Sequence, residues 1–148
     1  IPRIKAAVSF PIIVNGNIFE PRDVKSVFDE TGCDGVMIGR GAIDNPWIFR
    51  QSKEFLATGI PPPQASIDER VALCTDHLRL SIGHKGERTG VLEMRKHYSG
   101  YLRGLPGVAK LRAELMTYTT GDPVIERLAR FVDEMHKEPD PMAAQIFA

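Results

Sequence analysis

Two short runs of apolar residues, separated by one amphipathic segment, begin the pattern of this chain. Residues 12–14 and 36–38 are continuous apolar runs too short for helices, as expected for strands that are buried on both faces. Between them, apolar residues recur at helical spacing from Pro21, which suits a first helical turn, to Gly32, which suits a helix end. Strand, helix and strand within about 30 residues predict a parallel βαβ unit with a right-handed crossover.

Helical segments are predicted on both sides of this unit. Residues 1–10 carry apolar side chains at helical spacing, which fits the end of a helix that leads into the first strand. After the second strand, Asn45-Pro46 begins another helix, in which Trp47 and Phe49 are the first aromatic residues. These two rings could stack on a planar ligand, but their position favours packing in a core.

A proline-rich segment divides the chain. The sequence TGIPPPQAS, residues 58–66, contains three consecutive prolines and cannot continue a helix. We therefore predict an α/β domain over residues 1–58, a linker over 59–65, a helical domain over 66–137 and a flexible tail over 138–148.

Four amphipathic helices are predicted beyond the linker. The first begins with an S-x-x-E capping box at residues 66–69, and the apolar stripe of the second runs over residues 91–105. Pro106 begins the third helix, and Asp122-Pro123 provides the N-cap and the first position of the fourth. Short connections between four such helices indicate a compact antiparallel bundle.

The composition excludes a membrane-spanning segment and argues against a metal centre. Hydrophobic content of 43% and charged content of 26% are typical of a soluble globular protein. No apolar run approaches the roughly 20 residues that a bilayer requires. Cys33 and Cys74 lack CxxC or Cys/His ligand spacing, so we expect two small core residues in a reducing, cytoplasmic protein. Because the chain begins at Ile1 rather than methionine, we also expect it to be a portion of a longer protein.

The charge is balanced overall but not along the chain. Residues 85–112 contain seven Lys or Arg and two Glu, a local charge of +5, so the remainder of this neutral chain carries −5. Such an asymmetry can mark a surface that binds a polyanion, although for an isolated run of charge a solvated helix face is the favoured interpretation.

Each predicted strand ends in a glycine turn, NGN at residues 15–17 and GRG at residues 39–41. Backbone amides at the carboxyl ends of parallel strands can donate hydrogen bonds to phosphate oxygens, and Arg40 would add a charge-assisted contact. The loops after the last two strands of a (β/α)₈ barrel often form such a site. The alternative is a pair of ordinary turns without a ligand.

Three strings of this sequence resemble one known family. PIIVNGNIF at 11–19, DGVMIGRGAIDNPWIF at 34–49 and MRKHYSGYL at 94–102 are similar to strings of the tRNA-dihydrouridine synthases, close to the bacterial branch of nitrogen-regulation-like barrel proteins. The resemblance covers nearly the whole chain. It implies an FMN-binding TIM barrel and a helical tRNA-binding domain, in an enzyme that reduces the C5–C6 bond of a flipped uridine with NADPH.

The resemblance also implies roles for individual residues. The phosphate of FMN would be bound by Asn15, Gly16, Gly39 and Arg40. Asn17 stands where the family more often has aspartate, so it is left out of this set. The RNA-binding residues would be Arg95, Lys96 and His97 of the R-K-H string, together with Arg88 and Arg103. A packed or surface role for His97 is favoured over catalysis, and the catalytic cysteine of the family is expected upstream of this chain.

We therefore expect an α/β remnant of a (β/α)₈ TIM barrel, namely its last two βα units, followed by an all-α four-helix domain. Two strands cannot close an eight-stranded barrel, so we expect no reductase activity, weak or absent FMN binding, and self-association through exposed barrel elements. One alternative is a non-catalytic helical nucleic-acid-binding or regulatory module. Another is an FMN barrel that acts on a free pyrimidine or nucleotide, against which the basic helical domain argues.

Overall fold

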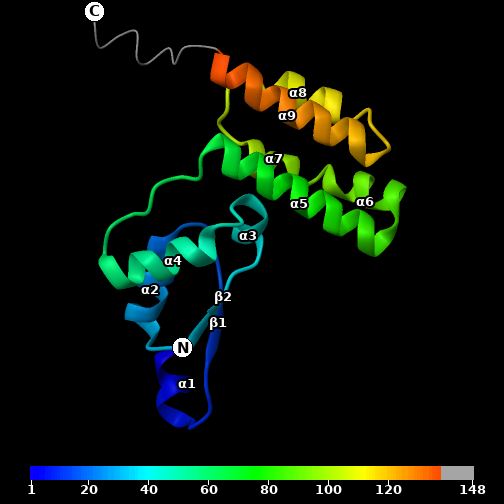
Figure 1. The fold of residues 1–148 in the computed structure, drawn as a ribbon. Helices are drawn as coiled ribbons and strands as arrows, with labels where there is room; N and C mark the ends of the chain where they lie inside the picture. Colours follow the sequence, from blue (N-terminus) through cyan, green and yellow to red (C-terminus); the bar gives the residue numbers. More distant parts are fainter. Residues whose placement is uncertain (138–148) are drawn as a thin grey trace, which may run out of the picture. The chain divides into compact units, whose positions relative to one another are not determined.

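The computed structural model describes residues 1–137, and the chain divides between residues 65 and 66 into two compact units (Figure 1). Residues 59–65 contain no helix or strand and connect the last helix of the first unit to the first helix of the second. The predicted flexible tail, 138–148, lies outside the described residues.

The first unit is an α/β unit built on two parallel strands. β1 pairs with β2 in a register that places Ile13 beside Gly35 and Asn15 beside Met37, which confirms the parallel βαβ unit. The short helix α3 was not predicted, because its GRG sequence has the composition of a turn. The elements are α1 (Pro2–Ala7), β1 (Ile13–Asn15), α2 (Pro21–Thr31), β2 (Gly35–Met37), α3 (Arg40–Asp44) and α4 (Ile48–Thr58).

Local sequence explains why α2 begins and ends where predicted. Pro21 occupies the first helical position, and the carboxylate of Asp23 accepts hydrogen bonds from the amides of Phe19 (2.8 Å) and Glu20 (2.9 Å). At the other end, Gly32 adopts the left-handed conformation and its N–H donates to the carbonyl of Phe28 at 2.9 Å. These bonds satisfy backbone groups that a helix end otherwise leaves without partners.

The core of the first unit lies on one side of the strands only. Ile18, Val24 and Ile48 are buried together, and half-buried side chains from α2 and the β2 segment pack against them. Within the described residues, Ile13 and Met37 are 68% and 57% exposed, so the prediction of strands buried on both faces is wrong for this chain. Phe49 is 51% exposed and Trp47 half-buried, so core packing is also wrong for Phe49.

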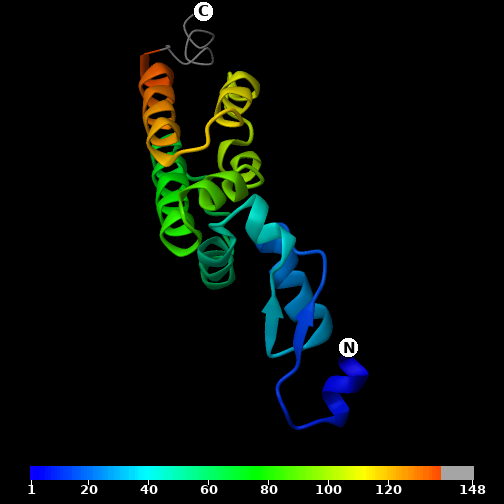
Figure 2. The ribbon, with the colours of Figure 1, turned by 90° about the vertical axis from the view of Figure 1, so that its right-hand side faces the viewer.

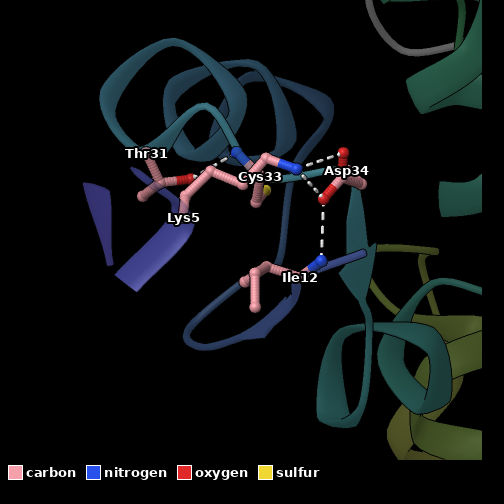
Figure 3. A network of polar contacts seen from close by, with 5 residues as sticks. All are labelled: Lys5, Ile12, Thr31, Cys33 and Asp34. Atoms are coloured by element: carbon pink, nitrogen blue, oxygen red, sulfur yellow. Dashed lines mark hydrogen bonds and ion pairs between the residues drawn. The ribbon is translucent and has the colours of Figure 1, made fainter. Parts of the chain in front are cut away.

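A polar network connects α1 to the start of both strands (Figure 3). Lys5 Nζ donates to the two carboxylate oxygens of Asp34 at 2.7 and 2.5 Å, and the backbone N–H of Ile12 donates to Asp34 Oδ2 at 2.7 Å. The bond from Lys5, and then the amide of Ile12, hold the pKa of Asp34 below its ordinary value of 3.8. Asp34 is therefore ionised whenever this network is formed.

This network predicts that the NMR chemical shift of the Ile12 amide changes in acid as Asp34 is protonated. Because its pKa is lowered in the folded state, Asp34 stabilises the fold above pH 3.8, and this contribution is lost as the pH falls through the lowered pKa. An NMR titration should show the Ile12 amide following a group that protonates below pH 3.8, and Asp34→Asn should abolish the change. Asp29→Asn, which removes the exposed ion pair with Lys25, should leave it intact. A midpoint at or above the ordinary value would contradict the assignment.

The second unit contains five helices within the described residues, rather than the four that were predicted. The helix that follows Ser66 begins with the predicted capping box, in which the side chains of Ser66 and Glu69 each accept a hydrogen bond from the other's amide. The helix expected from Pro106 begins two residues later, at Val108. The helix expected from Pro123 begins two residues earlier, at Gly121, so Asp122 lies inside the helix rather than at its N-cap. The elements are α5 (Ile67–Lys85), α6 (Glu87–Met94), α7 (Tyr98–Leu102), α8 (Val108–Leu115) and α9 (Gly121–Lys137).

The stripe predicted as one helix is interrupted between α6 and α7. The N–H of His97 bonds to the carbonyl of Met94 at 2.9 Å, an i to i−3 bond that tightens the chain into a turn. Met94 and Tyr98 remain buried on either side of it. The turn directs Arg95 toward a neighbouring loop, where its Nη2 donates to the carbonyl of Tyr118 at 3.2 Å.

The core of the second unit surrounds α5. Helices α6, α7 and α9 all pack against α5, and Figure 2 shows α5 and α9 as the two long helices of this unit. Cys74, Leu78, Val91 and Leu128 are each fully buried there. Cys74 and the buried Cys33 of the first unit are both free thiols, which confirms their prediction as small core residues. Burial raises the pKa of the Cys74 thiol to about 12, so it is an unreactive packing group.

Candidate functional site

The two glycine turns line one cleft at the carboxyl ends of β1 and β2. The cleft has a volume of about 300 Å³ and brings together the four residues predicted to bind a phosphate. This volume is at the lower limit of ligand pockets, about 300–1,000 Å³, and suits one end of a ligand. Its lining residues are Asn15, Gly16, Asn17, Ile18, Phe19, Gly39, Arg40 and Gly41.

Arg40 is held across the cleft by residues of the first turn. Its Nη2 donates to Asn17 Oδ1 at 2.9 Å, and its guanidinium carbon lies 5.7 Å from the centre of the Phe19 ring. Both contacts are with neutral groups, so within residues 1–137 the positive charge of Arg40 is oriented without being compensated by a carboxylate. An aspartate at position 17 would form an ion pair with the same guanidinium and reduce its attraction for an anion.

The glycines of this cleft serve two purposes. Gly41 lets two segments of the backbone pack closely, and Gly16 and Gly39 leave space for a ligand. A Cβ on the buried Gly41 would overlap the carbonyl oxygen of Ile18, so only glycine lets the first turn of α3 pack against the chain after β1. A Cβ on Gly16 or Gly39 would meet no atom within 4 Å. The amides of Arg40 and Gly41 begin α3 and have no acceptor within that helix. Open space, amide donors and an uncompensated guanidinium fit a phosphate group.

The basic residues of the second unit divide into structural and exposed groups. Arg95 connects the end of α6 to the loop at Tyr118 through the hydrogen bond of its Nη2. Its Nε is buried and has no partner within the described residues. The carbonyl of Arg103 accepts from Arg70 Nη2 at 2.5 Å, so the main chain at this residue is fixed from α5. Lys96 and Arg88 are exposed, and the described residues form no ion pair with either. Together with Arg103, which is also exposed, these two are the predicted RNA-binding residues that the fold leaves accessible.

His97 lies against a second histidine, His77 of α5, with 4.7 Å between the ring centres. His77 Nδ1 is 3.0 Å from the hydroxyl of Tyr101. Burial is the main cause that lowers the pKa of both histidines. Lys85 and Lys96 lower the pKa of His77 further. His77, Lys96 and Lys85 also lower that of His97, and Glu93 partly opposes them. Both imidazoles are therefore neutral at pH 7. The prediction of a packed or surface position for His97 agrees with this half-buried place.

Sequence reasoning missed three residues of these two regions. Asn17 departs from the family's aspartate and Phe19 is only one letter of a longer motif, so neither is predicted as a site residue, yet both contact Arg40. His77 sits between Cys74 and Leu78 of the apolar stripe, where a single histidine gave no signal of its own. Within residues 1–137, no helix has the length and apolar character needed to cross a bilayer.

Comparison with known proteins places the chain. A model of the family described as dihydrouridine synthase (Dus) matches residues 1–136. A tRNA-dihydrouridine synthase B of Pseudomonas aeruginosa is 35% identical over 144 residues, which are 97% of this chain and 43% of the relative. Another, of Pseudomonas syringae pv. tomato, is 37% identical over 142 residues, 95% of this chain and 42% of the relative.

A probable tRNA-dihydrouridine synthase of Rickettsia conorii is 34% identical over 128 residues, which are 86% of this chain and 39% of the relative. The chain thus spans less than half the length of these curated relatives. Nearly all of the chain is nevertheless covered by the family match. The chain belongs to the dihydrouridine synthase family.

Proposed function

We propose that this chain forms part of an FMN-dependent enzyme that reduces uridine to dihydrouridine in tRNA, with NADPH as the reductant. The cleft at Gly39 and Arg40 binds the phosphate of FMN, and the second unit contacts tRNA. The observation that carries the proposal is the cleft itself, in a chain of this family: an oriented, uncompensated guanidinium beside open glycine turns. When bound, FMN would supply a hydride to one carbon of the uridine C5–C6 bond, and an acid outside this set of residues would supply the proton to the other carbon.

The residues of this chain bind and orient; they do not carry the chemistry. Arg40 and the amides of the turns hold an anion at one end of the cofactor, while Asn17 and Phe19 fix the guanidinium. The exposed Ile13 and Met37 mark a face of the strands that needs cover from other strands or from a second copy. We accordingly expect the 148 residues alone to lack reductase activity and to self-associate.

The phosphate contact is tested by comparing FMN with riboflavin, which lacks the phosphate. In an NMR titration of the ¹⁵N-labelled chain, FMN should shift the amides of Gly39, Arg40 and Gly41, with a dissociation constant on the order of 1 mM for so small a set of contacts. Riboflavin should leave them unchanged, because it offers no anion to the cleft.

A matched pair of variants controls this titration. Arg40→Gln should abolish the shifts caused by FMN, whereas Arg22→Gln, the same change at an exposed residue of α2, should preserve them. Equal shifts with FMN and riboflavin, or shifts that survive Arg40→Gln, would show that the cleft does not bind the phosphate.

A further inference from the structure

The second unit contains a histidine pair that the cleft and the R-K-H string do not explain. His77 lies on α5 and His97 in the turn before α7, and their rings are tilted by 54° at a centre-to-centre distance of 4.7 Å. Both side chains are half-buried. Two imidazoles from separate helices therefore share one place at the edge of the fold.

The ring nitrogens of this pair are largely unsatisfied. Nδ1 of His77 meets the hydroxyl of Tyr101, whose position is fixed because Arg70 Nε donates to the Tyr101 carbonyl at 2.6 Å. Within residues 1–137, Nε2 of His77 and both nitrogens of His97 form no hydrogen bond. Half-buried imidazoles whose nitrogens lack partners are ready to bind a group that accepts hydrogen bonds.

The charges around the pair favour an anionic acceptor. Lys85, at the end of α5, is paired with Glu93 of α6, yet it lowers the pKa of both histidines, whereas Glu93 raises only that of His97. Lys96 precedes His97, acts on both imidazoles and has no ion pair within the described residues. α7 carries two titratable hydroxyls, those of Tyr98 and Tyr101, and that of Tyr101 contacts His77. The histidine–acid contact between Asp68 of α5 and His136 of α9 involves the first turn of α5 rather than the turn that carries His77.

We propose that His77, His97 and Lys96 form a binding site for a backbone phosphate of RNA, and that the histidine pair takes up a proton when the phosphate binds. The inference rests on the proposed contact between the second unit and tRNA. It adds His77 to the interface and couples the interface to pH. Lys96 provides a permanent charge, and the imidazoles become donors to the phosphate oxygens.

The sign of the coupling follows from the two states. Without RNA, burial and the lysines keep the pKa of each histidine below the ordinary value of 6.5, so the pair is neutral at pH 7. A bound phosphate favours the imidazolium and raises the pKa. Affinity therefore increases as the pH falls through the raised pKa and stops increasing below the lowered one.

The test is the affinity of the 148-residue chain for tRNA between pH 5.5 and 7.5 at constant ionic strength, measured by fluorescence polarisation. The unmodified chain should bind about tenfold more tightly at pH 5.5, and His77→Gln and His97→Gln should each remove most of this gain. His136→Gln, at an exposed histidine of α9, should retain it. Lys96→Gln should weaken binding at every pH. It should also reduce the slope of the logarithm of the binding constant against the logarithm of the salt concentration by about one.

Calorimetry gives a second readout that needs no variant. Titrations in buffers of different ionisation enthalpy should show uptake of up to about one proton on tRNA binding near pH 6.5. Binding with no proton uptake, or a pH dependence that both glutamine variants retain, would overturn the inference and leave the proposed tRNA contact standing. Absence of tRNA binding at every pH at low salt would overturn both.

Discussion

Gly90→Ala is expected to lower the free energy of unfolding of the second unit by about 2 kcal/mol. Gly90 is where α6 approaches α5 most closely: a Cβ there would lie 2.6 Å from the backbone nitrogen of Ile82 and 2.8 Å from the carbonyl carbon of Ser81. Backbone atoms cannot rotate away, so the helices must separate. Overpacking of this kind costs about 3 kcal/mol, and the higher helix propensity of alanine returns about 1 kcal/mol.

Gly83→Ala is the matched control for this prediction. Gly83 lies on α5, and a Cβ there would meet no atom within 4 Å. Only the higher helix propensity of alanine then acts, so the free energy of unfolding should rise by up to about 1 kcal/mol. Urea unfolding followed by circular dichroism at 222 nm measures both variants. Equal midpoints for Gly90→Ala and Gly83→Ala would mean that the two helices are not in close contact at this point.

The elements of the first unit could be predicted from local chemistry, but their burial could not. Apolar runs located both strands to within one residue, and Pro21 and Gly32 located the ends of α2, because these signals act within a few residues. Burial depends on what covers a face. The described chain packs α2 and its neighbours on one side of β1 and β2, and Ile13 on the other side stays exposed.

The helical unit shows a different limit of sequence reasoning. The apolar stripe over residues 91–105 continues at helical spacing through the turn at 94–97, so periodicity alone predicts one helix where the structure has two. The break becomes apparent only through Arg95, whose contact with the Tyr118 carbonyl joins segments that are distant in sequence.

The candidate site was predictable to the extent that its residues are neighbours in sequence. Asn15, Gly16, Gly39 and Arg40 were selected from two short motifs, and the parallel pairing of the strands brings them to one cleft. The contacts of Arg40 with Asn17 and Phe19 are side-chain contacts across that cleft, and no local pattern encodes them. The same reasoning explains why His77 was overlooked beside His97.

Gly41→Ala is expected to have the largest effect on the first unit. Its Cβ would overlap the carbonyl oxygen of Ile18 and lie 3.2 Å from Cα of Phe19, so the start of α3 would have to leave the chain that follows β1. We expect a loss of about 3 kcal/mol in the free energy of unfolding. A unit of this size, with so small a core, has little stability in reserve, so much of it should unfold near room temperature.

Trp47 makes this prediction measurable apart from the helical unit. It is the single tryptophan of the chain and belongs to the first unit, so its fluorescence reports the unfolding of that unit. Gly16→Ala is the control: its Cβ would meet no atom within 4 Å, and its φ is not positive, so the Trp47 transition should move by less than about 0.5 kcal/mol. Gly41 lines the cleft and also packs against Ile18, so its variant should lose the FMN-dependent amide shifts through unfolding. A Gly41→Ala chain with an unchanged Trp47 transition would show that the two turns do not pack together, and the phosphate cleft would then have no structural basis.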